Sequence, residues 1–245
     1  MSRIGDVHSL PLEDRDDADR KLARPWLLLH TPAPEVPVLA FAYGSSQPTE
    51  KKLAASPLSL DWTRTNGRRE HSEFYPARLR TPPPSEAGVR IGHADRHERI
   101  RHAFRDALGI TEGVRWSGDP HEAGRGRIVQ LSAAAQIRHD DARFAVIVTQ
   151  HGYALTRRYQ HLLPIYDLGE ILPEPGDVVS HAGWTRNLPR PMAEGAIVAV
   201  GGLFTGSEAR RPFVPGPIAG YTHQAVDEAT MVGVERALAA LYGLG

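Results

Sequence analysis

Short apolar runs, separated by turns and polar segments, recur along the whole chain. Twenty prolines and 23 glycines are spread among these runs, a distribution that favours strands joined by turns and loops over long helices. The pattern therefore predicts a mainly β protein with two helices. The expected strands are 5–10, 26–30, 36–43 and 73–79 in the first half, and 127–131, 144–150, 161–168, 177–181 and 196–204 in the second half.

Two segments carry the spacing of three to four residues that is typical of an amphipathic helix. The expected helices cover 95–108 and 224–242. Gly109 and Gly243 follow them, in the position where glycine often ends a helix. The apolar residues that define the spacing are Ile100, Phe104 and Leu108 in the first helix and Met231, Val234, Leu238 and Leu241 in the second.

The two halves of the chain repeat one order of features. Each half has a strand with basic flanks, a charged segment, an Ala-Arg step into an apolar run and a final amphipathic helix. The step contains Arg24 in the first half and Arg143 in the second. Repeat proteins have periods of roughly 20–50 residues, so this much longer period indicates a domain duplication, although any pair of small barrels with terminal helices gives a similar pattern. We predict two modules, 1–122 and 123–245, with the Gly-rich and charged stretch 111–126 as their linker.

Charge and composition narrow the range of partners. The chain has 29 Lys and Arg against 29 Asp and Glu, so it lacks the overall positive field that drives nonspecific nucleic-acid binding. The absence of cysteine excludes disulfides, thiol catalysis and cysteine-ligated zinc. The first residues show no signal pattern, and no apolar run approaches the roughly 20 residues that span a bilayer. We therefore expect a cytoplasmic protein with no membrane partner.

Two short motifs stand near the start of the chain. Gly5-Asp6-Val7 is followed, after a variable charged loop, by Arg24-Pro25 and a run of aliphatic residues. At this separation the two motifs resemble those of the MazF/PemK family. Leu79-Arg80-Thr81 is similar to the family's later Arg-Thr step, although Pro82-Pro83 replaces the hydrophobic-acid pair that normally follows.

The second half resembles the same family less closely. Arg143 matches the arginine of the Arg-Pro motif, but Phe144 replaces the proline. Phe204-Thr205 stands in the place of the later step and lacks its arginine. The second copy is therefore expected to be the more diverged of the two.

The resemblance carries expectations about fold and function. Members of the family are small SH3-like barrels with a C-terminal helix, and they act as sequence-specific RNA-cleaving toxins restrained by antitoxins. This implies two SH3-like barrels, each closed by a C-terminal helix, fused into an intramolecular pseudo-dimer. It also implies a metal-independent endoribonuclease or toxin-like growth inhibitor without cofactors, whose partners are single-stranded RNA and a cognate antitoxin or another protein. The alternative is a catalytically inactive module that binds nucleic acid or a protein partner.

Arg24 is the principal catalytic candidate. An arginine stays charged and makes forked hydrogen bonds to phosphate, so Arg24 suits the developing charge of a phosphorane. Arg80 would add a second cation, and a nearby histidine or carboxylate would transfer protons. The alternative role of Arg24 is an ion pair with an acidic residue of its own loop, which contains Asp16, Asp17 and Asp19.

The family also has a serine or threonine after its third strand. Alignment of the apolar strands places Tyr43 and Tyr166 there, whereas a shift of two residues brings Ser45 or Ser46 to this position in the first copy. The second copy then offers Asp167. Ser45 and Ser46 are accordingly candidates for a hydrogen bond to a phosphate oxygen.

Other polar clusters give weaker hypotheses. Arg157 and Arg158, beside Tyr159, are candidates for RNA binding, because cations beside aromatic rings are typical of surfaces for single-stranded nucleic acid. Arg143 is a further RNA-binding candidate because it matches the arginine of the family motif. An exposed hairpin tip would carry the same residues. His93 and His97 flank Asp95 and resemble a metal pair, but this spacing is common, and we interpret it as a solvated helix start. No metal site is therefore predicted.

Overall fold

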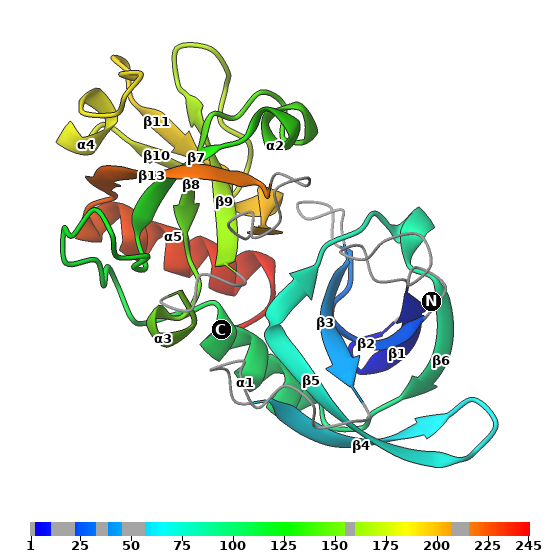
Figure 1. Cartoon of the computed structure of the whole chain (residues 1–245). Coiled ribbons are helices and arrows are strands. Elements are labelled where there is room, and N and C mark those ends of the chain that lie inside the picture. Colours follow the sequence, from blue (N-terminus) through cyan, green and yellow to red (C-terminus); the bar gives the residue numbers. More distant parts are fainter. Residues whose placement is uncertain (1–2, 11–22, 33–38, 46–56, 155–159, 207–215) are drawn as a thin grey trace. The chain divides into compact units, whose positions relative to one another are not determined.

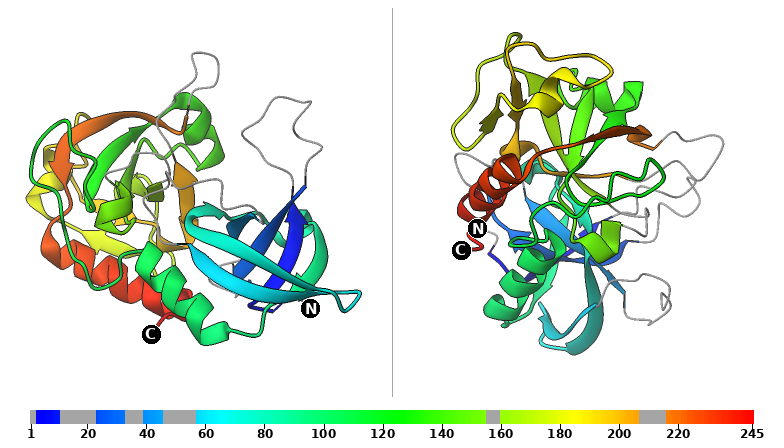
Figure 2. Two further views of the ribbon diagram at one scale, coloured as in Figure 1. Left: turned by 60° about the horizontal axis from the view of Figure 1, so that its bottom comes forward. Right: turned by 90° about the vertical axis from the view of Figure 1, so that its left-hand side faces the viewer.

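The computed structural model describes residues 3–10, 23–32, 39–45, 57–154, 160–206 and 216–245. The chain divides into two compact units, Met1–Phe104 and Arg105–Gly245, both of them mainly β (Figures 1 and 2). Among the described residues, no helix is long and apolar enough to cross a membrane. The candidates Ser46, Arg157, Arg158 and Tyr159 lie outside the described residues, as do Asp16, Asp17 and Asp19.

The first unit contains a six-stranded antiparallel sheet with the strand order β1-β2-β3-β5-β4-β6. Strand β6 pairs with both β4 and β1, so the ladder of strands closes on itself. Helix α1 (His97–Ala107) follows the last strand. The strands are β1 (Asp6–Leu10), β2 (Arg24–His30), β3 (Ala40–Ser45), β4 (Leu58–Arg64), β5 (Arg69–Arg80) and β6 (Val89–His93), with the 3₁₀ turn η1 (Pro84–Glu86) before β6.

The second unit contains a sheet with the order β10-β11-β9-β8-β7-β13, and β12 also pairs with β9. In the described part of this unit, no pairing joins β10 to β13, so this sheet stays open. Its strands are β7 (Arg127–Leu131), β8 (Phe144–Ile147), β9 (Gln160–Asp167), β10 (Val178–Ser180), β11 (Ala196–Val198), β12 (Phe204–Gly206) and β13 (Ile218–Ala225). Its helices are α2 (Ala133–Arg138), α3 (His151–Ala154), α4 (Gly183–Arg186) and α5 (Glu228–Leu241), with the 3₁₀ turn η2 (Val200–Gly202).

The two sheets share one topology. Starting from the last strand, the spatial order is β6-β1-β2-β3-β5-β4 in the first unit and β13-β7-β8-β9-β11-β10 in the second. If β11 and β12 are counted as one interrupted strand, these two orders are identical, strand for strand. The interruption is η2, and the first unit has a register shift in β5 at the corresponding place. A long helix follows the sixth strand in each unit. This common order supports the predicted duplication.

The first strands of both sheets begin with the same backbone contact. The N–H of Gly5 donates to the carbonyl of Leu28 at 2.9 Å, and the N–H of Gly126 donates to the carbonyl of Ile147 at 2.8 Å. Both glycines have positive φ, 91° and 87°, in the region that glycine adopts without steric cost. Gly5 and Gly126 are therefore structurally equivalent.

The junction between sixth strand and helix repeats as well. Ala94 donates its N–H to the carbonyl of Gly5 at 2.9 Å, and Val226 donates to that of Gly126 at 3.0 Å. The strand registers extend this equivalence along both sheets. The matched pairs are Asp6 with Arg127, His8 with Val129, Arg24 with Arg143, Ser45 with Tyr166, Glu73 with Ile197, Arg80 with Phe204 and His93 with Ala225.

The stretch expected to be a linker is instead part of the second unit. The guanidinium of Arg125, fully buried, donates to the carbonyls of Leu108 (2.6 Å) and Val148. It also pairs with Glu235 of α5 at 2.8 Å, and Glu235 accepts from the N–H of Gly113 at 2.9 Å. Thus 105–126 is tied to the second sheet and its helix, and the division between the units falls before the predicted boundary at 122.

Candidate functional site

Three polar residues stand side by side on neighbouring strands of the first unit. Trp26 pairs with Tyr43, and the same register, continued by two residues, brings Arg24 of β2 opposite Ser45 of β3. Ser45 in turn pairs with Glu73 of β5. Residues directly opposite one another share a face of the sheet and have Cβ atoms about 5 Å apart. We call this set the Arg24–Ser45–Glu73 row.

An aromatic row lies next to it on the same face. Trp26 meets Tyr43 edge-on with ring centroids 5.5 Å apart, and Tyr43 lies 6.2 Å from Tyr75. All three rings are buried. The hydroxyl of Tyr75 donates to Oε2 of Glu73 at 2.8 Å. The buried aromatic row therefore fixes one end of the polar row through the Glu73 carboxylate.

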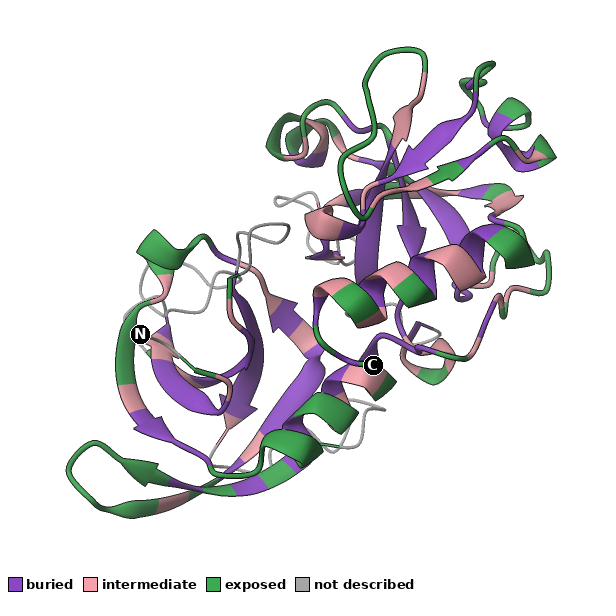
Figure 3. Ribbon diagram, turned by 180° about the vertical axis from the view of Figure 1, so that it is seen from behind, coloured by how far each residue is buried: buried purple, intermediate pink, exposed green. Residues whose placement is uncertain are grey.

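A histidine network continues the polar row onto β4. Ser59 pairs with Glu73 and Asp61 pairs with His71, which places these residues on the same face. Nδ1 of His71 lies 2.8 Å from Oδ1 of Asp61, and Nε2 lies 3.0 Å from Oγ of Ser59. With Nδ1 donating to the carboxylate, Nε2 accepts from the hydroxyl. These three residues are exposed, so the imidazole is accessible to a ligand. The hairpin of β4 and β5 carries exposed positions along its length, which are green in Figure 3.

Arg24 supplies the positive charge of the row. Its Nε atom is buried and, in the described part of the chain, has no hydrogen-bond partner. A buried donor without a partner is costly, so a bound anion would satisfy it. The alternative ion pair with the acidic loop falls on residues outside the described ranges.

Arg80 lies apart from the row. It pairs with Phe41, at the other end of β3 from Ser45, and four residues of strand correspond to roughly 13 Å. Its guanidinium is 4.0 Å from the carboxylate of Glu86. The structure therefore brings together Arg24 and Ser45, but not Arg80, among the catalytic candidates.

The second unit has different residues at the equivalent positions. Arg143 is exposed and retains the cation, but Tyr166 stands in place of Ser45 and Ile197 in place of Glu73. The hydroxyl of Tyr166 donates to the carbonyl of His139 at 2.9 Å, and burial raises the pKa of Tyr166 to about 12. This unit thus has no aliphatic hydroxyl and no carboxylate beside its arginine in the row.

Arg143 and Tyr166 also line a small surface pocket with an acidic rim. The acidic residues of the rim are Asp140, Asp141, Asp167 and Glu170. Among the described residues that line this pocket, Arg190 is the other cation, and it pairs with Glu170 at 3.2 Å. Four carboxylates against two guanidiniums disfavour a phosphate group here. The pocket therefore gives no support to RNA binding by Arg143.

The sequence prediction did not single out four polar residues that the structure places on the same face as Arg24 and Ser45, namely Glu73, His71, Ser59 and Asp61. Glu73 begins the expected strand 73–79, whereas His71, Ser59 and Asp61 lie outside every expected strand and helix. The sequence gives no periodic signal around His71, because the five residues from Arg69 to Glu73 are all polar and show no alternation with apolar ones.

Comparison of the sequence with protein-family models gives no match, and a search of curated proteins likewise gives none. The functional argument therefore depends on the chemistry of the residues in the site.

Proposed function

We propose that the first unit is a metal-independent endoribonuclease that cleaves single-stranded RNA at the Arg24–Ser45–Glu73 row. The observation that carries this proposal is the alignment of a cation, a hydroxyl and a carboxylate across three adjacent strands, with an imidazole beside them. These are the groups that phosphodiester cleavage by the ribose 2′-hydroxyl requires in the absence of a metal ion.

Each group has a distinct task in this reaction. Glu73 accepts the proton of the 2′-hydroxyl, whose oxygen then bonds to phosphorus while the bond from phosphorus to the 5′-oxygen breaks. His71, in its protonated form, gives a proton to the leaving 5′-oxygen. Arg24 stabilises the charge of the phosphorane, and Ser45 donates to a non-bridging oxygen. The products are a 2′,3′-cyclic phosphate and a 5′-hydroxyl.

The requirement for a single strand follows from the same geometry. The 2′-oxygen must lie in line with the leaving oxygen, and only an unpaired, flexible nucleotide turns easily into that arrangement. Recognition of single-stranded RNA is also the common mode for sequence-specific proteins. The chain's resemblance to MazF/PemK toxins agrees with this substrate and extends the proposal to a toxin-like growth inhibitor, held inactive by a cognate antitoxin.

The second candidate function is binding without cleavage. It is favoured by the second unit, where Tyr166 and Ile197 replace the hydroxyl and the carboxylate of the row. In this alternative, the first unit also only holds its ligand, nucleic acid or a protein partner, with Arg24.

A cleavage assay separates these two functions. The full chain is incubated in EDTA with a long mixed-sequence RNA and with DNA of the same sequence. We expect cleavage of RNA alone, ending in cyclic phosphates, and its loss in Arg24→Ala. Arg143→Ala, the matched change in the second unit, should retain cleavage. Intact RNA with the wild-type chain contradicts the nuclease, and retardation of that RNA in a gel then supports the binding module.

A further inference from the structure

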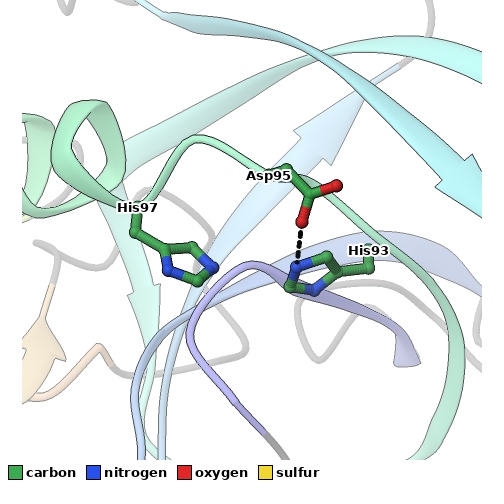
Figure 4. A group of neighbouring side chains, drawn as sticks. All are labelled: His93, Asp95 and His97. Atoms are coloured by element: carbon green, nitrogen blue, oxygen red, sulfur yellow. Dashed lines mark ion pairs between the residues drawn. The ribbon is translucent and has the colours of Figure 1, made fainter.

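Three potential metal ligands gather where β6 ends and α1 begins (Figure 4). One ligand atom from each of His93, Asp95 and His97 lies within 4.8 Å of the other two. Nε2 of His93 is 2.9 Å from Oδ1 of Asp95. The two imidazoles meet at right angles, with their ring centroids 5.7 Å apart.

His93 is held in position from behind by a buried carboxylate. Its Nδ1 lies 2.9 Å from Oδ1 of Asp6, a residue only 1% exposed. Asp6 also accepts from Nε of Arg90 at 2.8 Å and from the N–H of Arg3 at 2.9 Å, so its position is fixed on three sides. Metal-binding histidines are typically oriented by such a carboxylate on the nitrogen remote from the metal.

This contact determines which nitrogen of His93 is available. With Nδ1 donating to Asp6, Nε2 carries the lone pair and faces Asp95 and His97. The His93 side chain is 9% exposed, and in the described part of the protein no donor forms a hydrogen bond to its Nε2, whose polar neighbour is the Asp95 carboxylate at 2.9 Å. A buried nitrogen lone pair without a donor, beside a carboxylate and a second imidazole, is suited to a cation.

The backbone at Gly5 makes room for the cluster. A Cβ atom on Gly5 would lie 2.4 Å from the carbonyl oxygen of Ala94 and 3.1 Å from Cε1 of His93. It would also lie 3.4 Å from the ring of His97. The start of β1 therefore packs directly against both histidines, and the positive φ of Gly5 permits that approach.

We propose that His93, Asp95 and His97 bind one divalent transition-metal ion of the zinc type, with Asp6 as the outer partner of His93. Two imidazoles and one carboxylate favour zinc over magnesium or calcium, which take oxygen ligands. Three protein ligands leave the fourth position of a tetrahedral site to water. The ion connects the end of β6 to the first turn of α1 and so stabilises the first unit by mass action.

The second unit lacks this site. Ala225 stands in the position of His93, and Arg127 stands in the position of Asp6. Its junction between strand and helix instead has Asp227, whose carboxylate caps α5 by accepting from the N–H of Thr230 at 2.9 Å. The duplicated junction is thus closed by a helix cap in one unit and, we infer, by a metal ion in the other.

Calorimetric titration of the full chain with ZnCl₂, after removal of metal with EDTA and dialysis, tests the site. We expect one zinc ion per chain and an affinity at least about tenfold lower in Asp95→Asn and in His97→Ala, a loss in the range known for metal-site changes. Asp95 is 90% exposed, so its replacement leaves the fold intact, which circular dichroism checks. His223→Ala removes an exposed histidine of the second unit and serves as the matched control.

The outcomes divide clearly. Zinc should raise the thermal unfolding temperature of the wild type and of His223→Ala, but not that of the two ligand variants. Equal zinc affinity in all four proteins, or no binding by the wild type, contradicts the proposal. The readout is metal binding, whereas the nuclease assay is performed in EDTA, so either proposal can fail without the other.

Discussion

The first and second units place opposite charges at the same buried position. In the first unit Asp6 accepts hydrogen bonds from Arg90 and His93. In the second unit Arg127 occupies that position and donates to the carbonyls of Thr222 and Pro120, among others, at 2.9 and 2.6 Å. Both residues are almost completely buried. A duplicated scaffold accepts either charge because each is fully satisfied by hydrogen bonds.

The polar row differs between the units in another way. The first unit combines Arg24, Ser45 and Glu73, whereas the second retains only the arginine and replaces the other two by Tyr166 and Ile197. The first three strands of each unit pair in the same register. The comparison teaches that the fold is maintained by backbone pairing and apolar packing, while the polar side chains on one face diverge independently.

The largest expected effect concerns the carboxylate that only the first unit has. Glu73→Gln removes the proposed base without changing the shape of the side chain, and we expect RNA cleavage to fall by about 10²–10⁴-fold. Tyr166→Phe serves as the control. Tyr166 occupies the position of Ser45 in the second unit, next to that of Glu73, and its replacement should leave cleavage unchanged. Initial rates on one labelled RNA measure both. A rate within threefold, roughly 0.7 kcal/mol, of the wild type for Glu73→Gln would show that this carboxylate is not the base.

The second prediction concerns the ion pair that holds 105–126 in the second unit. Glu235→Ala leaves the buried guanidinium of Arg125 without its charged partner, which should destabilise the second unit by about 3–5 kcal/mol. Urea unfolding measures the loss. The control is Glu170→Ala, which breaks the exposed pair with Arg190 and should cost at most about 1 kcal/mol. Similar values for the two variants would refute the structural role of the buried pair.

The third prediction tests the buried acid of the first unit. Asp6→Asn removes the negative charge that Arg90 and His93 contact, and we expect a loss of about 1.5–3 kcal/mol in the free energy of unfolding. Arg3→Ala removes only an exposed partner of Asp6 and should have a much smaller effect. An Asp6→Asn protein as stable as the wild type would mean that the carboxylate acts as a neutral acceptor.

The smallest expected effect depends on pH. Burial lowers the pKa of His8 below its ordinary value, so the unfolded chain takes up the proton more readily than the folded one. The stability that neutral His8 contributes is complete at pH values above the unfolded pKa, about 6.5, and is lost as the pH falls toward the lowered folded pKa. Val129 occupies the equivalent position in the second unit, so His8→Val introduces a residue that this fold accepts. The variant should lose less stability as the pH falls. Thermal unfolding between pH 5 and pH 8 measures the loss.

A remaining pH dependence in His8→Val is expected from the second unit. Burial also lowers the pKa of His139, which stacks on Phe204 at 3.9 Å. An unchanged pH dependence of the first unit in the variant would show that His8 contributes nothing to it.

Much of the strand pattern was predicted from local sequence. The strand 127–131 was placed at the bounds of β7, and both long helices were found within a few residues of α1 and α5. The mainly β character is confirmed, but the expectation of two helices was wrong: the described residues contain five α-helices, of which α2, α3 and α4 are short. The SH3-like barrels, the toxin family and the RNA-cleaving function stay predictions.

Three strands were missed for identifiable reasons. In β4, the apolar residues Leu58, Leu60 and Trp62 alternate with polar residues, a period-two pattern typical of a strand that the prediction did not use. Strand β6 is short and contains Gly92, and β13 combines glycine with polar residues at the edge of its sheet. In β6 and β13 few apolar residues alternate with polar ones, and periodicity is then too weak to reveal a strand.

The sequence by itself indicated most of the strands and both long helices, the repeated order of features in the two halves, and the matched arginines Arg24 and Arg143. Only the tertiary structure decided which polar residues meet: Glu73 with Ser45, His93 with Asp6, and Arg125 with Glu235. The physical reason is that hydrophobic periodicity specifies the face on which a side chain lies. Its neighbours across the sheet depend on strand register, which pairing between distant segments sets.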